Sequence, residues 1–494
     1  MTRTQSLLAN VSLVVASLAI CIGLAEAALA FIDWLHPRWI LDTSGTSTTG
    51  AHLDEVPLAS GVSRDLFFVD PAPLPNRTKP PQEWIELDHQ LQKAPQGATA
   101  ADGFKQWDMW KAWNAVFVGD PCQNRHFRGA PSRLFVYDPP DGNPRPPFRY
   151  LSKTTTPMGL TTNDFGWRGP PVAFRREPNT VRIVFVGAST TAEPQGYPYS
   201  GPEHVGAWLD RWAADEKLDV KFEVLNAGRE SLRSADIAAV VQQEVIPLQP
   251  DLVLYYEGNL DLELSTIVSN VSPGVPRAAG LLANWLRDLS PYLRTAERAQ
   301  GLLEVGEWPK PTYTIHWPLA ERDPDLTRSD LPLKLSSILR NIDTMREGLA
   351  AGHSELALSS FHWLARHDLV LNGLRNAAAI EELNVRWFPY HYADLERATA
   401  FENRVFAKYA VLHSLPFIDV ARYMPYDPDL FTDATHNTPF GVRLRAWIVF
   451  QQLVPIIESR LSSKAWPRPA STMGNSHPAF RTPPRLIEFS CKLH

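Results

Sequence analysis

The strongest constraint on the fold is the alternation of short β-branched strands with helical segments from residue 181 onward. The run at 181–186 reads Val-Arg-Ile-Val-Phe-Val, and similar short runs follow at 222–225 and 252–256. Between them, apolar residues recur at helical spacing over 205–212 and 237–246. Strands that alternate with helices at this spacing form βαβ units. The sequence therefore predicts an α/β domain built on a central parallel sheet.

The later part of the chain predicts an interruption of this rhythm and then its return. Amphipathic segments over 278–380 predict a helical insertion. A short strand is expected at 415–420 and a long helix at 439–461, with Thr438 as the N-cap and Pro439 in the first turn. The α/β domain is thus expected to span 181–461.

The N-terminal segment predicts a membrane helix. Residues 7–32 contain one charge, Glu26, and are long enough to cross a bilayer as a helix. Arg3 precedes the segment, so residues 1–6 are expected in the cytoplasm and the main domain outside it. A cleaved signal peptide is the alternative, because small residues at 25–27 and 28–30 fit a cleavage site.

The segments around the α/β domain differ from it in composition. Residues 33–100 are rich in Pro, Ser and Thr and are expected to form an extended stalk. Residues 101–180 carry Trp and Pro clusters and are expected to pack on the α/β domain as a preamble. Residues 462–494 are a C-terminal tail.

Composition excludes several classes of function. The 494-residue chain has 48 Lys+Arg against 54 Asp+Glu, and this net charge of -6 argues against nucleic acid as a partner. None of its three cysteines has the spacing of a zinc or redox motif. No metal or cofactor is expected. Cys122 and Cys491 are the only cysteines outside the apolar segment, so a disulfide between them is a hypothesis.

Polar residues follow the predicted strands where a parallel sheet places its site. Ser189 follows the first strand, Asn226-Ala227-Gly228 the second and Gly258-Asn259 the third, and Asp433 to His436 precede the last helix. Since the carboxyl ends of parallel strands meet at one edge, these four segments should converge. Together they offer the parts of a serine hydrolase.

Each of these residue types has a chemical reason to be there. Ser189 needs a base to become a nucleophile, and His436 has a suitable unperturbed pKa. Asp433 would orient the imidazole and stabilise its charged form. The amides of Ser189 and Gly228, with the Asn259 carboxamide, would form an oxyanion hole.

Taken singly, the same residues have structural readings. Ser189 could be a helix N-cap, Gly228 a turn glycine and Asn259 a turn residue. His436 could be a hydrogen-bonded structural histidine. The shared position of Ser189, Gly228 and Asn259 after successive strands favours catalysis. For His436, the Asp three residues earlier and the helix opened by Thr438-Pro439 do so.

These blocks resemble the SGNH (GDSL-like) hydrolases of the bacterial membrane-anchored type. The resemblance covers about residues 160–460 and rests on 163–169, 183–191, 226–228, 258–259 and 433–436. Ala188 and Leu260 stand where many members have Asp. It implies a flavodoxin-like three-layer sandwich with a central parallel sheet and the residue roles given above.

The expected function is a serine-dependent esterase that acts outside the cytoplasm, on O-acyl or O-acetyl groups of envelope glycans or lipids. The alternatives are an O-acyltransferase that uses the same serine and an inert glycan-binding or assembly protein on this fold. The sequence leaves open the acyl chain, the acceptor, the pathway and the oligomeric state.

Overall fold

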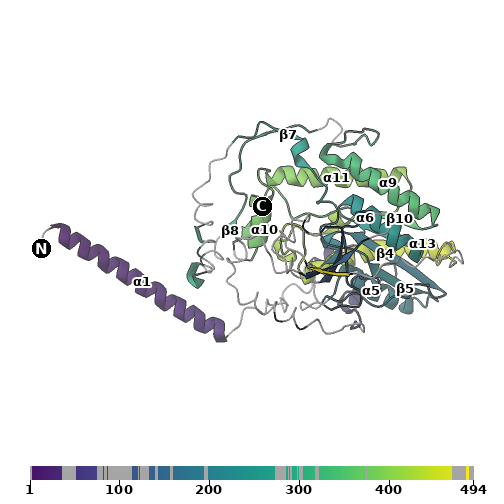
Figure 1. Cartoon of the computed structure of the whole chain (residues 1–494), viewed down its shortest axis with the longest axis horizontal. Helices are drawn as coiled ribbons and strands as arrows, with labels where there is room; N and C mark the ends of the chain where they lie inside the picture. Colours follow the sequence, from purple (N-terminus) through teal and green to yellow (C-terminus); the bar gives the residue numbers. More distant parts are fainter. Residues whose placement is uncertain are drawn as a thin grey trace.

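The fold is described from a computed structural model of the full chain. The structure describes residues 3–35, 52–74, 114–120, 133–138, 143–155, 160–193, 199–272, 304–317, 322–373, 375–469 and 485–488, and a few scattered residues between 82 and 122 and between 285 and 299. The N-terminal helix projects from a body that contains the central sheet (Figure 1).

The central sheet has five parallel strands in the order β12-β10-β6-β4-β5. The strands are β4 (Thr180–Gly187), β5 (Lys221–Asn226), β6 (Leu252–Tyr256), β10 (Glu355–Ser359) and β12 (Phe417–Ile418). Numbered along the chain, their spatial order is 2-1-3-4-5, which is that of flavodoxin-like sheets. The expected parallel sheet is therefore present, and its first three strands lie where the sequence predicted them.

Helices pack on the sheet and bury its central strands. Every residue of β4 and β6 is buried, as expected for parallel strands covered on both faces. Helix α5 packs against α13, and α6 packs against α9. In Figure 1, α9 and α11 lie above β4 and β10, and α5 lies below β4, beside β5. The helices are α5 (Gly201–Asp215), α6 (Ser234–Val240), α9 (Leu335–Ala351), α11 (Tyr392–Leu412) and α13 (Pro439–Ser462).

Shorter elements connect this framework. They are α4 (Ser189–Ala192), α10 (Ala377–Glu381), the π-helical turn η10 (Glu382–Arg386), α12 (Val420–Tyr423), β7 (Val268–Ser269), β8 (Glu304–Val305), β9 (Thr314–Ile315) and β11 (Leu371–Asn372). The 3-10 turns are η7 (Ile246–Leu248), η8 (Leu264–Thr266), η9 (Pro332–Lys334) and η11 (Pro428–Leu430), and α6 continues into the π-helical turn η6 (Val241–Val245).

The insertion expected over 278–380 needs correction. Its second half holds α9 and β10, and β10 pairs with β6 in the middle of the sheet. The five residues of β10 are flanked by polar and aromatic segments, so their short apolar pattern alone did not reveal a core strand. The α/β domain therefore uses this half as part of its core.

The stalk expected over 33–100 also needs correction, for residues 52–74. This segment forms the 3-10 turns η2 (Leu53–Glu55) and η3 (Arg64–Phe68). The Phe67 side chain is 1% exposed and packs on Trp208 of α5 and Trp447 of α13. Apolar residues spaced between the prolines anchor the segment, so it is part of the folded body. Residues 33–35 belong to the N-terminal helix, and the other residues of the expected stalk lie outside the described ones, apart from isolated positions.

A second, smaller sheet combines segments from both ends of the chain. Its order is β13-β2-β1-β3, from β1 (Ala115–Val118), β2 (Arg133–Tyr137), β3 (Phe148–Tyr150) and β13 (Arg485–Glu488). On β3, Arg149 donates to Glu244 at 2.8 Å and so ties the sheet to the α/β domain. Cys122 is disulfide-bonded and Cys21 is free, while Cys491 lies outside the described residues.

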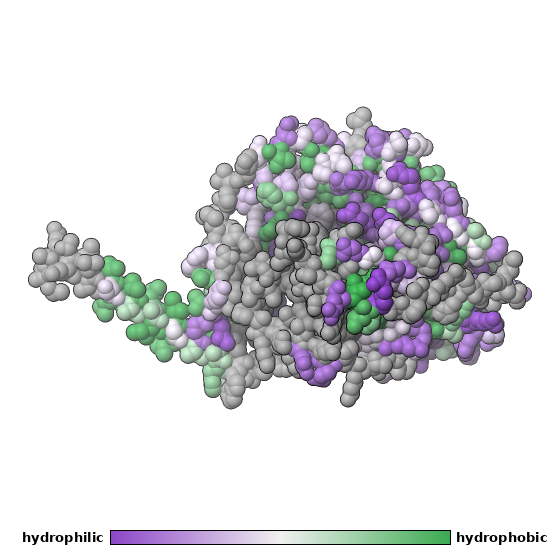
Figure 2. Space-filling model, viewed as in Figure 1, coloured by the Kyte–Doolittle hydropathy of each residue, from purple (hydrophilic) through white to green (hydrophobic). Residues whose placement is uncertain are grey.

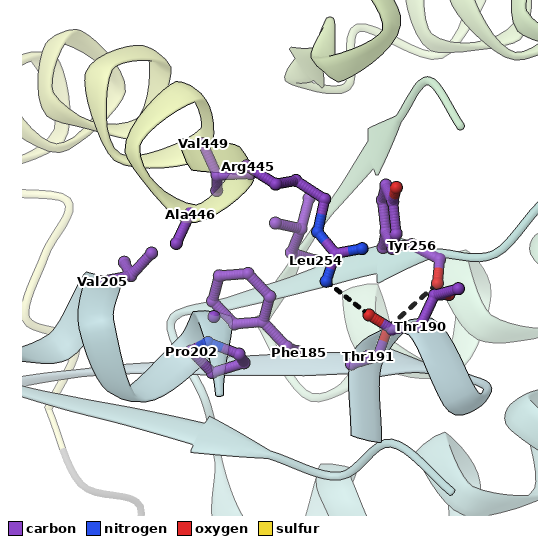
Figure 3. A pocket seen from close by; sticks show the side chains of 11 residues that line it. Phe185, Thr190, Thr191, Pro202, Val205, Leu254, Tyr256, Arg445, Ala446 and Val449 are labelled. Carbon is purple, nitrogen blue, oxygen red and sulfur yellow. Dashed lines mark hydrogen bonds between the residues drawn. The ribbon is translucent and has the colours of Figure 1, made fainter. Parts of the chain in front are cut away.

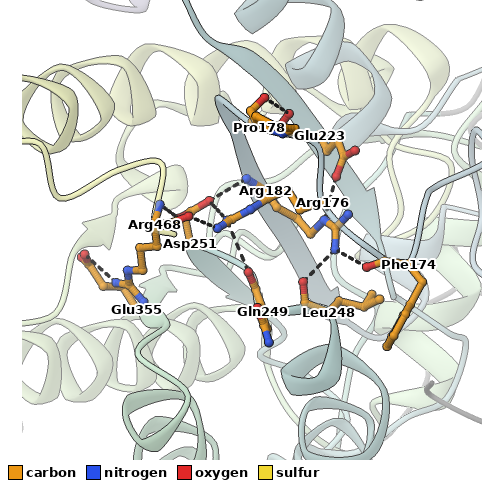
Figure 4. A network of polar contacts seen from close by, with 11 residues as sticks. Phe174, Arg176, Pro178, Arg182, Glu223, Leu248, Gln249, Asp251, Glu355 and Arg468 are labelled. Atoms are coloured by element: carbon orange, nitrogen blue, oxygen red, sulfur yellow. Dashed lines mark hydrogen bonds and ion pairs between the residues drawn. The ribbon is translucent and has the colours of Figure 1, made fainter. Parts of the chain in front are cut away.

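Buried charges join the amino ends of the central strands (Figure 4). Asp251, just before β6, accepts from the Arg182 amide of β4 at 2.8 Å and from the Arg468 amide at 2.9 Å. The Arg182 side chain pairs with Glu223 of β5 at 2.7 Å. This network fixes the strands at the end of the sheet opposite the candidate site, since buried charges need such partners.

Two described helices are long and apolar enough to cross a membrane. One lies within α1 (Arg3–Leu35), whose span Asn10–Ile32 is not buried at all, and the other is α13, which is mostly buried in the body. Figure 2 shows the apolar surface of the projecting α1. Helix α1 therefore has the properties of a signal anchor or signal sequence, whereas α13 is a core helix.

Candidate active site

Three side chains from two distant segments form a hydrogen-bonded chain. Ser189 Oγ lies 2.7 Å from His436 Nε2, and His436 Nδ1 lies 2.7 Å from Asp433 Oδ2. The structure thus brings together the three residues predicted as catalytic. With the imidazole proton on Nδ1, Nε2 is free to accept the serine proton.

The turn that carries Ser189 is shaped by close packing after β4. A Cβ on Gly187 would lie 2.2 Å from both Thr191 Oγ1 and the Tyr256 carbonyl, so only glycine fits there. Helix α4 begins at Ser189, which is half-buried while its neighbours Ala188 and Thr190 are buried. The chain therefore exposes the serine from an otherwise packed turn.

Two buried arginines donate hydrogen bonds to backbone carbonyl groups of this turn and so fix it. Arg445 of α13 donates to the Thr190 carbonyl at 2.6 Å and pairs with Glu193, which follows α4. Arg168 donates to the carbonyls of Ala192 and Glu193. Arg168 lies within the 163–169 block of the resemblance, whereas Arg445 gave no signal in the sequence.

A small, largely apolar pocket lies beside the same turn, between α5 and α13 (Figure 3). Figure 3 shows the Arg445 side chain reaching across it toward α4. Burial lowers the pKa of Arg445 to about 9, and its ion pair with Glu193 meets the need of a buried charge for a partner. Neither Ser189, Asp433 nor His436 lines this pocket.

The loop before α13 presents Asp433 and His436 together. Asp433 Oδ1 accepts from the backbone amides of Thr435 at 2.8 Å and His436 at 2.7 Å, which closes a tight turn. Thr438 then caps α13 by accepting from the Gly441 amide at 3.2 Å, as predicted. This turn explains the three-residue spacing between the carboxylate and the imidazole.

The electrostatics of the pair favour an ionised carboxylate next to an imidazole that protonates easily. Burial lowers the pKa of His436, but the Asp433 carboxylate outweighs it and raises that pKa above its usual value. Burial opposes ionisation of Asp433, yet His436 and the two backbone amides hold the Asp433 pKa well below its usual range. The imidazolium formed on proton transfer would therefore be stabilised.

The Asn259 loop lies at the same edge of the sheet as Ser189. Gly187 of β4 is in register with Tyr256 of β6, so both chains leave the sheet side by side. The buried Glu257 accepts from the amides of Asn259 at 3.0 Å and Leu260 at 2.9 Å and fixes the loop. Burial raises the pKa of Glu257 to about 7.

The Gly228 amide, predicted as an oxyanion donor, already has a hydrogen-bond partner in this structure. The Gly228 amide donates to the Asn226 side-chain oxygen at 3.0 Å, so it is engaged within its own loop. A Cβ at Gly228 would lie 2.6 Å from the Ala192 amide nitrogen. The glycine at this position is therefore explained by close packing against α4. Gly228 is not among the described glycines with positive φ, so the turn-glycine interpretation does not apply to it.

Sequence reasoning missed one acidic residue beside the triad. Glu382 of η10 is 7% exposed and accepts from the Ala434 amide at 3.0 Å. It lies just beyond the expected insertion, with no motif around it. Only its contact with the Asp433–His436 loop identifies it.

Within the described part of the chain, no group of three His, Cys, Asp or Glu residues is placed to hold a metal ion. The arrangement of Ser189, His436 and Asp433 is suited to acyl transfer through a serine nucleophile.

Comparisons with known proteins give distant structural matches. No protein-family profile and no curated protein sequence matches the chain. A GDSL-like lipase from Bacteroides thetaiotaomicron is 12% identical, with 59% of this chain and 93% of that chain covered and a TM-score of 0.30. A lipase/acylhydrolase from Enterococcus faecalis is 16% identical, with 55% and 95% covered and a TM-score of 0.30.

An acetyl xylan esterase from Geobacillus stearothermophilus is 13% identical, with 57% of this chain and 97% of that chain covered and a TM-score of 0.31. These three matched structures are thus a GDSL-like lipase, a lipase/acylhydrolase and an acetyl xylan esterase. Because the TM-scores and identities are low, the functional proposal rests on this chain's own strand order and side-chain geometry.

Proposed function

We propose that the protein is an SGNH-type serine esterase. The observation that carries the proposal is the pair of 2.7 Å contacts that link Ser189 to His436 and His436 to Asp433 at the carboxyl edge of the sheet. A serine that only caps α4 would not need an imidazole at its hydroxyl and a carboxylate behind that imidazole.

In this proposal Ser189 Oγ attacks the ester carbonyl while His436 Nε2 takes the serine proton. The C–O bond to the alcohol then breaks, and His436 returns the proton to the departing oxygen. Water attacks the acyl-serine by the same route, which releases the acid and restores Ser189. Asp433 keeps the imidazole in the required tautomer throughout.

The oxyanion of each tetrahedral intermediate needs donors that are already in place. The Ser189 amide and the Asn259 carboxamide are the proposed donors, and the engaged Gly228 amide is not among them. The loop that carries Asn259 is held by the buried Glu257, which limits its movement.

The proposed substrates are O-acyl or O-acetyl groups on a carbohydrate or lipid of the cell envelope. The exposed apolar span Asn10–Ile32 supports a location at a membrane. The proposed extracytoplasmic side for the main domain rests on Arg3, which precedes the span. The protein would then meet acylated envelope molecules directly.

Labelling with a fluorophosphonate tests the proposed nucleophile without knowledge of the natural substrate. We expect the full-length protein to be labelled at Ser189, and His436→Ala to abolish labelling because the hydroxyl loses its base. Peptide mapping by mass spectrometry locates the adduct. A folded protein that stays unlabelled, or is labelled elsewhere, would contradict the proposal.

Asn259→Ala tests the oxyanion hole. We expect kcat on p-nitrophenyl acetate to fall by about 10² to 10³ with little change in KM, because an oxyanion donor acts mainly in the transition state. Leu260→Ala, in the same loop, is the control and should keep kcat near the wild-type value. An effect of Asn259→Ala confined to KM would instead make Asn259 a ground-state binding residue.

A further inference from the structure

Glu382 is a buried carboxyl group placed directly behind the candidate catalytic loop. Its side chain is 7% exposed, and Glu382 Oε2 accepts from the Ala434 amide at 3.0 Å. Ala434 lies between Asp433 and His436 and is itself fully buried. A buried carboxyl group is costly, so its conformation is fixed by what it binds.

The Asp433–His436 turn is held on both sides of Ala434. Glu382 accepts a hydrogen bond from the Ala434 amide, and the Ala434 carbonyl accepts one from the Leu364 amide at 2.8 Å. Glu382 begins the π-helical turn η10, and such turns occur often at functional sites. The Asp433–His436 turn is thus joined to η10 through Glu382 and to the segment after β10 through Leu364.

We propose that Glu382 is a positioning residue for the esterase, one that fixes the Asp433–His436 turn through Ala434 and adds negative charge behind the imidazole. This inference rests on the proposed function, because it assigns Glu382 a role in the reaction of Ser189. Glu382 does not touch the reacting atoms. It acts through the place and the basicity of His436.

The charges around Glu382 support this role. Three groups face it: Asp433 and His436 from the catalytic loop, and Arg386, whose side chain is 57% exposed and lies 3.4 Å from Glu382 Oε1. Burial, helped by Asp433, raises the pKa of Glu382 to about 7. Ionised Glu382 in turn raises the pKa of His436, because it favours the imidazolium.

Two substitutions separate the charge from the hydrogen bond. Glu382→Gln keeps an oxygen acceptor for the Ala434 amide but removes the charge. We expect it to shift the inflection of kcat/KM against pH downward and to change the plateau by less than about tenfold. Glu382→Leu removes both, and we expect kcat to fall by about 10², since small displacements of catalytic groups cost this much.

Glu381→Gln and Glu381→Leu are the matched controls, because Glu381 is exposed and directly precedes Glu382 as the last residue of α10. Both controls should keep the wild-type pH profile and kcat. The activity measurements use the full-length protein in detergent with p-nitrophenyl acetate as the probe. An unshifted profile in Glu382→Gln, with wild-type kcat in Glu382→Leu, would overturn the inference while the esterase proposal stands.

Hydrogen–deuterium exchange gives a readout that does not need activity. We expect the peptide that contains Ala434 to exchange faster in Glu382→Leu than in wild type or Glu381→Leu, because its amide loses its acceptor. Unchanged protection in Glu382→Leu would overturn the positioning role, even if the wild-type protein proved to lack esterase activity. If the wild-type protein proved inactive and Glu382→Leu still exchanged faster at this peptide, the proposed function would be contradicted. Glu382 would then have a purely structural role.

Discussion

Ser189→Ala is expected to reduce hydrolysis of p-nitrophenyl acetate to the background rate. Loss of the nucleophile from a tuned triad lowers kcat by a factor on the order of 10⁶. The contact of Ser189 Oγ with His436 Nε2 at 2.7 Å is the geometric reason for this expectation. Turnover by the purified variant, followed against a no-enzyme blank, measures the effect.

The same substitution should leave the fold almost unchanged. Ser189 is half-buried, and one lost side-chain hydrogen bond is worth about 0.5 to 1.5 kcal/mol. The melting temperature should therefore stay close to that of wild type. Ser265→Ala, at an exposed serine, is the control and should keep full activity. Wild-type turnover in a folded Ser189→Ala protein would remove Ser189 as the nucleophile.

Asp433→Asn is expected to slow the reaction and to move its pH dependence. In serine proteases the equivalent change lowers kcat by about 10⁴, because the imidazole is held in the wrong tautomer. Here the contact of Asp433 Oδ2 with His436 Nδ1 at 2.7 Å would hold the imidazole in the required tautomer. Initial rates of Asp433→Asn and wild type between pH 5 and pH 9 measure both effects.

The direction of the pH shift follows from the groups that raise and lower the pKa of His436. The base must be neutral, so kcat/KM should rise with pH through the His436 pKa of the free enzyme. Burial lowers this pKa and Asp433 raises it above the usual value. Without the Asp433 charge the burial effect dominates, and the inflection should move to lower pH.

Asp429→Asn is the matched control, because Asp429 is an exposed carboxylate ahead of the same loop. Its pH profile should coincide with that of wild type. If the inflection stays in place in Asp433→Asn, Asp433 does not interact with the base. A wild-type profile without an inflection would exclude His436 as the base.

The amino-acid sequence alone determined the elements that carry the site. The apolar runs that became β4 and β6 are buried on both faces, and β5, at the edge of the sheet, is buried over most of its length, so their pattern is strong and local. Thr438 and Pro439 marked the start of α13 because capping depends on neighbouring residues only. Ser189 could be chosen because it follows β4, and Asp433 and His436 because they precede α13.

Only the tertiary structure decided how the remaining segments are used. The five-residue strand β10 became recognisable through its pairing with β6, and Phe67 turned a proline-rich segment into part of the core. In both cases the stabilising contacts join residues far apart in sequence, which no local periodicity encodes.

The same limit applies within the site. Whether the Gly228 amide was available depended on the conformation of Asn226, and whether Glu382 mattered depended on the position of Ala434. A hydrogen bond is specified by the distance and direction between two groups. The sequence therefore determined which chemical groups reach the carboxyl edge of the sheet, and the packing of η10, α13 and the connecting loops decided which of them face one another.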